Sequence, residues 1–121
     1  MTDQDQAAQA QEMLKAVHDD KCAEINGRQY HITKVNHKKR RKVFAFFSKV
    51  QNDVKYGNMW FLDSQEWADV EKTIENVVTF EGNLLSKLPD HWDNYPEDYL
   101  VFVSTMMGAL SYPFLSGLNG G

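Results

Sequence analysis

The chain has 121 residues, of which 42% are hydrophobic and 25% are charged, and its formal net charge at pH 7 is −4. This length corresponds to one domain, and the apolar fraction excludes an intrinsically disordered chain. The acidic balance argues against a protein dedicated to coating nucleic acid. The single cysteine, Cys22, excludes an intramolecular disulfide and is typical of a reducing cytoplasm.

Charge is unevenly distributed along the chain. Residues 1–20 carry a net charge of −4, residues 21–56 carry +8 and residues 57–121 carry −8. Segments of opposite net charge on one small protomer favour docking between copies, or docking against an oriented partner surface. We therefore expect a homo-oligomer, built as a ring or a spiral.

Residues 1–20 are predicted to form a polar leader with a weak helical pattern. Ala10, Met13, Leu14 and Val17 are spaced like one face of a helix, but few apolar residues support that face. This leaves open a frayed helix and a helix that orders only on binding. The acidic start is unlike the basic start of a secretory leader, so we expect no targeting segment.

A β-hairpin is predicted over residues 22–34. The dipeptide Asn26-Gly27 supplies the two residues with positive φ that a type I′ turn requires. In the second strand Tyr30 alternates with Ile32, which gives that strand one partly apolar face.

Three helices are predicted after the hairpin, over residues 37–56, 64–79 and 96–111. Asn36 is the expected N-cap of the first helix, and Asp63 is the expected N-cap of the second. The third helix follows Pro96 and is apolar on all sides, which places it in the core or in an oligomer interface.

The predicted fold is mainly α with a small N-terminal β-hairpin (α+β), with about four helices around one core. It comprises a single globular domain over residues 21–115, followed by a flexible, glycine-rich tail over residues 116–121. Residues 99–121 carry no charge, but they contain Pro113 and no flanking Lys or Arg anchors them. We therefore expect a buried core helix there and no membrane span.

A basic run opens the helix predicted over residues 37–56. Three interpretations remain open for it: a solvated or internally paired turn, a protein contact, and a nucleic-acid contact. Consecutive basic residues point around a helix, so we expect no single phosphate-facing stripe, and nucleic acid is the least favoured partner. The residues of the run are Lys38, Lys39, Arg40, Arg41 and Lys42.

Four aromatic residues in predicted connecting segments are further candidates for partner contact, because exposed aromatic side chains in loops often mark a binding surface. These residues are Trp60, Phe61, Trp92 and Tyr95. Trp67 lies at helical spacing with other apolar residues and is expected in the core.

The sequence offers no motif for catalysis or metal binding. It has neither a nucleophile elbow nor a phosphate-binding glycine loop. His18 and Cys22 are four residues apart, but structural zinc needs four ligands and no second pair has matching spacing. We therefore expect a protein that is not an enzyme and that uses no metal or cofactor.

The order of these patterns resembles the tail assembly chaperones of long-tailed bacteriophages. The resemblance rests on INGRQYHI at residues 25–32, KKRRKVF at residues 38–44 and ALSYPFL at residues 109–115. It covers roughly residues 22–118. It implies a mostly helical fold with a small hairpin, and a function without catalysis in the cytoplasm of the infected host cell.

Chaperones of this family bind the tape measure protein, keep it soluble and help recruit tail tube subunits, in many cases through a longer frameshifted form. The resemblance implies these two partners and implies absence from the mature virion. It assigns no functional residue, so the basic run and the loop aromatics are hypotheses from the residues alone. The alternative is a small phage-type regulator that binds nucleic acid or a host protein through the basic helix start.

Overall fold

The computed structural model describes residues 3–118 of the chain, with side chains described from residue 12 onward. The described part is 68% helical and has four helices of seven or more residues and one antiparallel sheet of four strands. The helices are α1 (Asp3–Asp20), α2 (His37–Lys55), α3 (Gln65–Glu75), the short α4 (His91–Asn94) and α5 (Tyr99–Leu118). The strands are β1 (Cys22–Ile25), β2 (Arg28–Ile32), β3 (Val78–Phe80) and β4 (Asn83–Leu84). Three 3₁₀ turns are η1 (Trp60–Asp63), η2 (Leu85–Lys87) and η3 (Pro96–Asp98).

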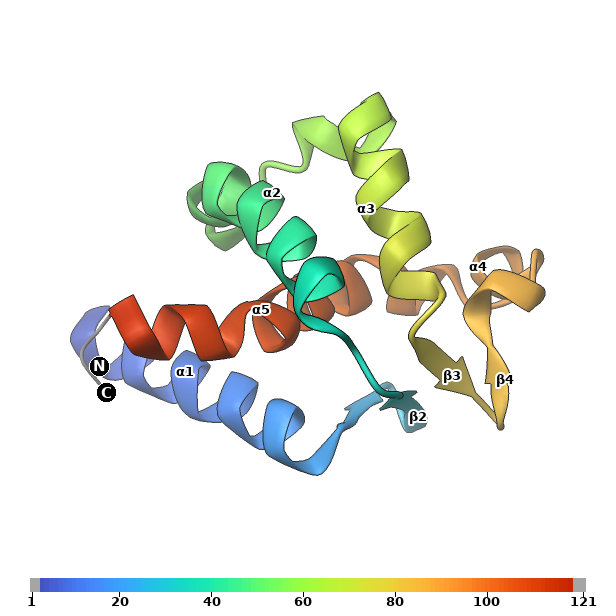
Figure 1. Ribbon diagram of the computed structural model, residues 1–121, viewed down its shortest axis with the longest axis horizontal. Coiled ribbons are helices and arrows are strands. Elements are labelled where there is room, and N and C mark those ends of the chain that lie inside the picture. The colour runs from blue at the N-terminus through green and yellow to red at the C-terminus, as the bar shows by residue number, and fades with distance from the viewer. Residues whose placement is uncertain (1–2, 119–121) are drawn as a thin grey trace.

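The α5 helix is the centre of the molecule. Figure 1 shows α1 lying along one side of α5 while α2 crosses its other side, and α3 packs next to α2. Seven of the eight positions from Val103 through Leu110 in α5 are buried, and the exception, Ser104, is half-buried. This arrangement confirms the predicted fold class of four helices around one core.

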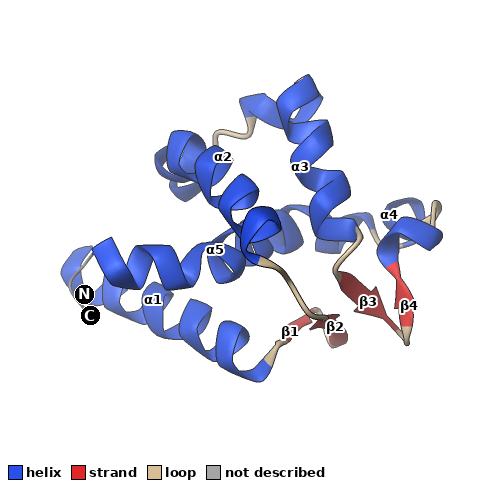
Figure 2. Cartoon of the chain, viewed as in Figure 1, coloured by secondary structure: helices blue, strands red, loops and turns tan. Residues whose placement is uncertain are grey.

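The first hairpin forms as the sequence predicts. Asn26 and Gly27 have φ values of 52° and 81°, the left-handed geometry of a type I′ turn, and Ile25 pairs with Arg28 across it. Tyr30 and Ile32 both face the core, with exposed fractions of 0% and 9%. The sheet lies at one end of the molecule (Figure 2).

A second hairpin, β3–β4, was not predicted and shortens α3. The helix predicted over residues 64–79 ends at Glu75, because Val78 and Phe80 belong to β3, which pairs with β2. Glu81 and Gly82 form its turn with φ values of 52° and 81°. The β-branched run before this turn favours a strand over the last turn of a helix.

The N-cap residues mark where α2 and α3 begin. Asn36 is the N-cap of α2 as predicted, and its side chain accepts a hydrogen bond from the Lys39 backbone N–H at 2.9 Å. The N-cap of α3 is Ser64, whose Oγ accepts from the Trp67 backbone N–H at 3.1 Å, so the prediction of Asp63 is wrong by one residue.

The predicted ends of the chain also differ from the structure. The weak leader is the regular helix α1, in which Val17 is buried and Leu14 lies on Gly108 of α5. The last helix begins at Tyr99 and continues through Pro113 to Leu118, so residues 116–118 of the predicted tail are helical. Residues 119–121 lie outside the described part of the chain.

Within residues 3–118, one helical segment, Pro96–Leu118, is long and apolar enough to cross a membrane by length and composition. Half of its most apolar window is buried inside the protein. This part of the window is buried because α5 packs between α1 and α2 (Figure 1).

Candidate functional site

The basic run occupies the first turns of α2, and four of its five residues are exposed. These four are Lys38, Lys39, Arg41 and Lys42. All four are exposed, but Lys39 stands one helical turn before Val43 and so lies on the same side of α2 as this core-facing residue. The four exposed cations therefore spread around the start of α2, and that they form no single phosphate-facing stripe stays a prediction. We call them the α2 basic surface.

Arg40 has a different position, half-buried between α2 and α5. Its Nη1 donates a hydrogen bond to the Leu110 carbonyl oxygen at 3.0 Å. Pro113 has no N–H to donate to the Ala109 carbonyl, which precedes by one residue the carbonyl that Arg40 binds. Burial lowers the pKa of Arg40. Arg40 is therefore not one of the exposed cations of the run.

No carboxylate neutralises the α2 basic surface within residues 12–118, whose side chains the structure describes. The ion pairs in that part of the chain join Arg28 to Glu97 and Asp98, and Lys49 to Glu66. The internally paired interpretation of the basic run therefore receives no support from these side chains. The α2 basic surface is open to solvent or to a partner.

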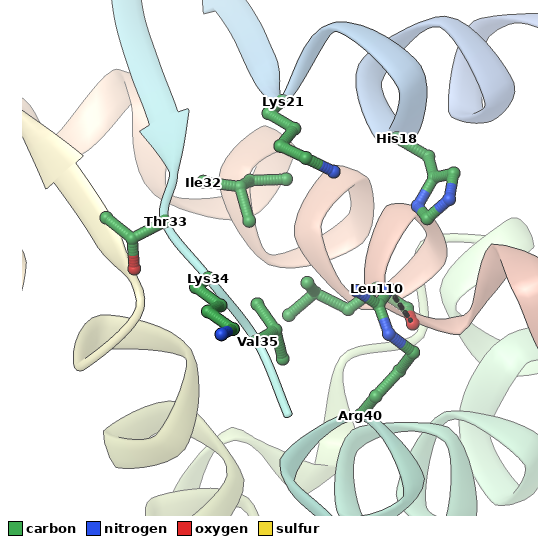
Figure 3. A pocket seen from close by; sticks show the side chains of 8 residues that line it. All are labelled: His18, Lys21, Ile32, Thr33, Lys34, Val35, Arg40 and Leu110. Atoms are coloured by element: carbon green, nitrogen blue, oxygen red, sulfur yellow. Dashed lines mark hydrogen bonds between the residues drawn. The ribbon is translucent and has the colours of Figure 1, made fainter. Parts of the chain in front are cut away.

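A small cavity of about 140 Å³ adjoins the basic run, where the end of α1, the strand β2 and the start of α2 meet α5. Lys21, Lys34 and Arg40 line it together with His18 (Figure 3). Burial lowers the pKa of the His18 imidazole, and the positive charges of Arg40 and Lys21 lower it further. The cavity is thus a site of concentrated positive charge.

The floor of the same cavity is apolar. Ile32, Val35 and Leu110 line it between the cationic side chains (Figure 3). Ile32 and Leu110 belong to the buried core, and Val35 packs against that core. The cavity therefore offers both apolar contact and positive charge to an entering group.

The aromatic pair Trp60 and Phe61 divides between surface and core. Phe61 is 0% exposed and packs between Phe46 and Trp67, so its predicted place on a binding surface is wrong. Trp60 is 61% exposed, and its Nε1 donates to the Asp53 carboxylate at 2.9 Å. Trp60 remains a candidate contact, at the opposite end of α2 from the basic run.

Trp92 and Tyr95 are half-buried and support the interior. The Trp92 ring stacks on Tyr30 with ring centroids 6.2 Å apart, and its Nε1 donates to the Glu75 carboxylate at 3.0 Å. The Arg28 guanidinium lies 4.1 Å from the centre of the Tyr95 ring. These contacts occupy most of both rings, so the prediction of two exposed loop aromatics is wrong.

A buried polar network, which the sequence analysis missed, joins the first hairpin to the start of α5. The Asp98 carboxylate is 0% exposed and accepts hydrogen bonds from Asn26 Nδ2 at 2.7 Å, Arg28 Nη1 at 3.0 Å and Tyr30 Oη at 2.7 Å. Burial raises the pKa of Asp98, but these three hydrogen bonds outweigh burial and the pKa is lowered.

The network fixes the tautomer of His91. Tyr30 has one hydroxyl proton, which it donates to Asp98, so the hydrogen bond of 2.8 Å between Tyr30 Oη and His91 Nε2 requires a proton on Nε2. Burial lowers the pKa of His91, although the charge of Asp98 acts in the opposite sense. The network therefore holds a neutral imidazole and a charged carboxylate on either side of one hydroxyl.

Apart from the basic run with its cavity and the Asp98 network, the described part of the chain offers few groups for binding or catalysis. Residues 12–118 contain no group of three or more His, Cys, Asp or Glu side chains that could hold a metal ion. Comparison of the chain with protein-family models, curated protein sequences and solved structures finds no match. The function must therefore be argued from the α2 basic surface, its neighbouring cavity and the sequence patterns.

Proposed function

We propose that this protein is a bacteriophage tail assembly chaperone that binds and solubilises the tape measure protein and helps recruit tail tube subunits. The observation that carries the proposal is the α2 basic surface, which faces solvent without a carboxylate partner among the described side chains. The order of sequence patterns supports the same family. The protein acts without catalysis, in the host cell cytoplasm, and is absent from the mature virion.

A protein partner fits this surface better than nucleic acid does. The chain as a whole is acidic, and its residues 57–121 carry a net charge of −8, which repels a phosphate backbone. Binding a long helical chain needs many weak contacts, both charged and apolar, repeated over several copies. Exposed Leu100 and Val101 on α5 and Trp60 after α2 supply apolar contacts of this kind.

Charge reversal on the α2 basic surface tests the proposal. In the double variant Lys39→Glu with Arg41→Glu, we expect the co-expressed tape measure protein to become insoluble, whereas it stays soluble with the wild-type chain. Acidic residues in the first turns of a helix are favourable, so these substitutions should not unfold α2. Solubility after lysis, followed by co-purification, is the measurement.

The matched control is Lys72→Glu with Lys87→Glu, which changes the net charge equally at two exposed positions away from α2. This control should keep the tape measure protein soluble. A tape measure protein that stays insoluble with the wild-type chain in molar excess would contradict the proposal. Tight binding of the wild-type chain to random duplex DNA at about 150 mM salt, with a steep salt dependence, would favour the regulator instead.

A further inference from the structure

The cavity beside the basic run has features that the α2 basic surface lacks. Lys21 comes from the junction of α1 with β1, Lys34 from the segment after β2, and Arg40 from α2, so three separate elements bring positive charge to one hollow (Figure 3). No acidic side chain lines it. Three cations that converge on one hollow, without a carboxylate among its lining residues, favour an anionic group between them.

The shape and lining of the cavity indicate which anion fits. The space of about 140 Å³ has an apolar part of its wall, Ile32, Val35 and Leu110, between its cationic groups, and this part is the floor of the cavity. An anionic group with a short aliphatic stem can place the stem on this floor and its oxygens near the cations. The carboxylate of an amino-acid side chain has such a stem, whereas a backbone phosphate is flanked by two sugars.

We propose that this cavity receives the carboxylate of a glutamate or aspartate side chain presented by the partner protein. This inference rests on the proposed function, because it assigns the partner an acidic residue that enters the cavity while the α2 basic surface contacts its surroundings. Lys21 and Lys34 make the charge contacts. Arg40 remains bound to the Leu110 carbonyl and contributes its charge from the cavity wall.

The test uses the full chain and a short capped peptide that contains several glutamates, with the glutamine version of the same peptide as its neutral counterpart. Binding is followed by the NMR signals of the backbone amides and of the His18 ring. We expect the glutamate peptide alone to bind and to raise the pKa of His18, because a bound anion opposes the effect of Arg40 and Lys21.

Two double variants with the same loss of charge separate the cavity from the helix surface. Lys21→Gln with Lys34→Gln should weaken peptide binding about tenfold or more, since it removes cations from the site itself. Lys38→Gln with Lys42→Gln should weaken binding only about twofold, through a slower encounter. The backbone hydrogen bonds of Lys21, to Val17 and from Ile32, do not use its side chain, so the fold should be kept.

Several results would overturn the inference. Equal weakening of peptide binding by both double variants would show that net charge alone attracts the peptide. If inorganic phosphate or duplex DNA bound more strongly than the glutamate peptide, the cavity would be assigned to phosphate. If the double variant Lys21→Gln with Lys34→Gln still captured the tape measure protein as well as the wild-type chain does, the cavity would be rejected as the binding site of a partner carboxylate. The proposed function would remain. Peptide binding by the wild-type chain that fails to solubilise the tape measure protein would reject the function and support the cavity.

Discussion

At the scale of single residues, Asp98 has the most demanding environment in the described structure. It is fully buried with a negative charge, and three donors from the first hairpin hold that charge. We expect Asp98→Ala to lower the free energy of unfolding by about 3 kcal/mol, because it leaves buried donors without an acceptor. Urea denaturation measures the change. A loss no larger than that of an exposed substitution such as Asp93→Ala would contradict this.

The two perturbed histidines predict how stability changes with pH. The pKa values of His91 and His18 are lowered in the folded state, chiefly by burial, so the unfolded chain binds more protons. The contribution of these two histidines to stability is therefore complete above about pH 6.5, the ordinary pKa of imidazole, and is lost as the pH falls below that value. The lowered pKa of Asp98 adds a further decline below about pH 3.9.

Denaturation curves between pH 7 and pH 5 test this dependence. The variant His91→Gln retains a side-chain donor for Tyr30 but cannot titrate, so its stability should fall less over this interval than that of the wild-type chain. His18→Gln gives the corresponding measurement for the cavity. A His91→Gln variant whose stability falls more than that of the wild-type chain between pH 7 and pH 5 would show that the sign of the His91 contribution is wrong.

We expect the substitution Ser111→Ala to increase the stability of the protein. The Ser111 hydroxyl is buried in α5 and has no hydrogen-bond partner among the described residues. Replacing Ser111 with alanine removes an unsatisfied polar group and improves helix propensity, so we expect the free energy of unfolding to rise by about 1 kcal/mol. Thermal unfolding measures it. Ser104→Ala is the matched control, because the Ser104 hydroxyl donates to the Leu100 carbonyl and should gain less.

At the scale of elements, the sequence predicts those structures whose signal is local. Asn26-Gly27 has the residue types that a type I′ turn prefers, and the first hairpin forms there. The turn at Glu81-Gly82 has the same backbone geometry, but glutamate seldom adopts positive φ, so no sequence rule marked it. Residues 78–80 form a strand because they pair with β2, and this contact joins segments far apart in the sequence.

The candidate site was predicted less well than the fold, for a related reason. Loop position indicated exposure for Phe61, but burial depends on whether Phe46 and Trp67 lie nearby in space. Arg40 belongs to a basic run by sequence, yet its guanidinium lies against α5 and donates a hydrogen bond to the Leu110 carbonyl. The cavity combines three distant segments, and no motif in the chain could have indicated it.

Two glycine substitutions test the second hairpin. Gly82 has a φ of 81°, so Gly82→Ala forces a left-handed alanine and should cost about 1 kcal/mol of stability. Gly117 lies near the end of α5 with open space around it, so Gly117→Ala should not destabilise and should gain a little helix propensity. Denaturant midpoints of the two variants give the comparison. Equal effects would contradict the assigned turn.

At the scale of the whole molecule, the opposed charge of its segments predicts self-association. Residues 21–56 carry a net charge of +8 and residues 57–121 carry −8, and the α2 basic surface is free of internal ion pairs with the described carboxylates. Sedimentation should show a mass above 14.0 kDa at low salt. The mass should fall as salt screens the contact. A strict monomer at high concentration in both conditions would contradict the oligomer.

The antiparallel pairing of β2 with β3 also sets the order in which the chain can fold. Each hairpin closes over a few residues, which takes microseconds, whereas the contact between Tyr30 and Phe80 must wait until the intervening helices have come together. On the ribosome, the first hairpin and α2 emerge before α5, against which α2 packs. The nascent chain therefore exposes the apolar side of α2 until its last helix arrives, and co-translational folding should be completed only when α5 has left the exit tunnel.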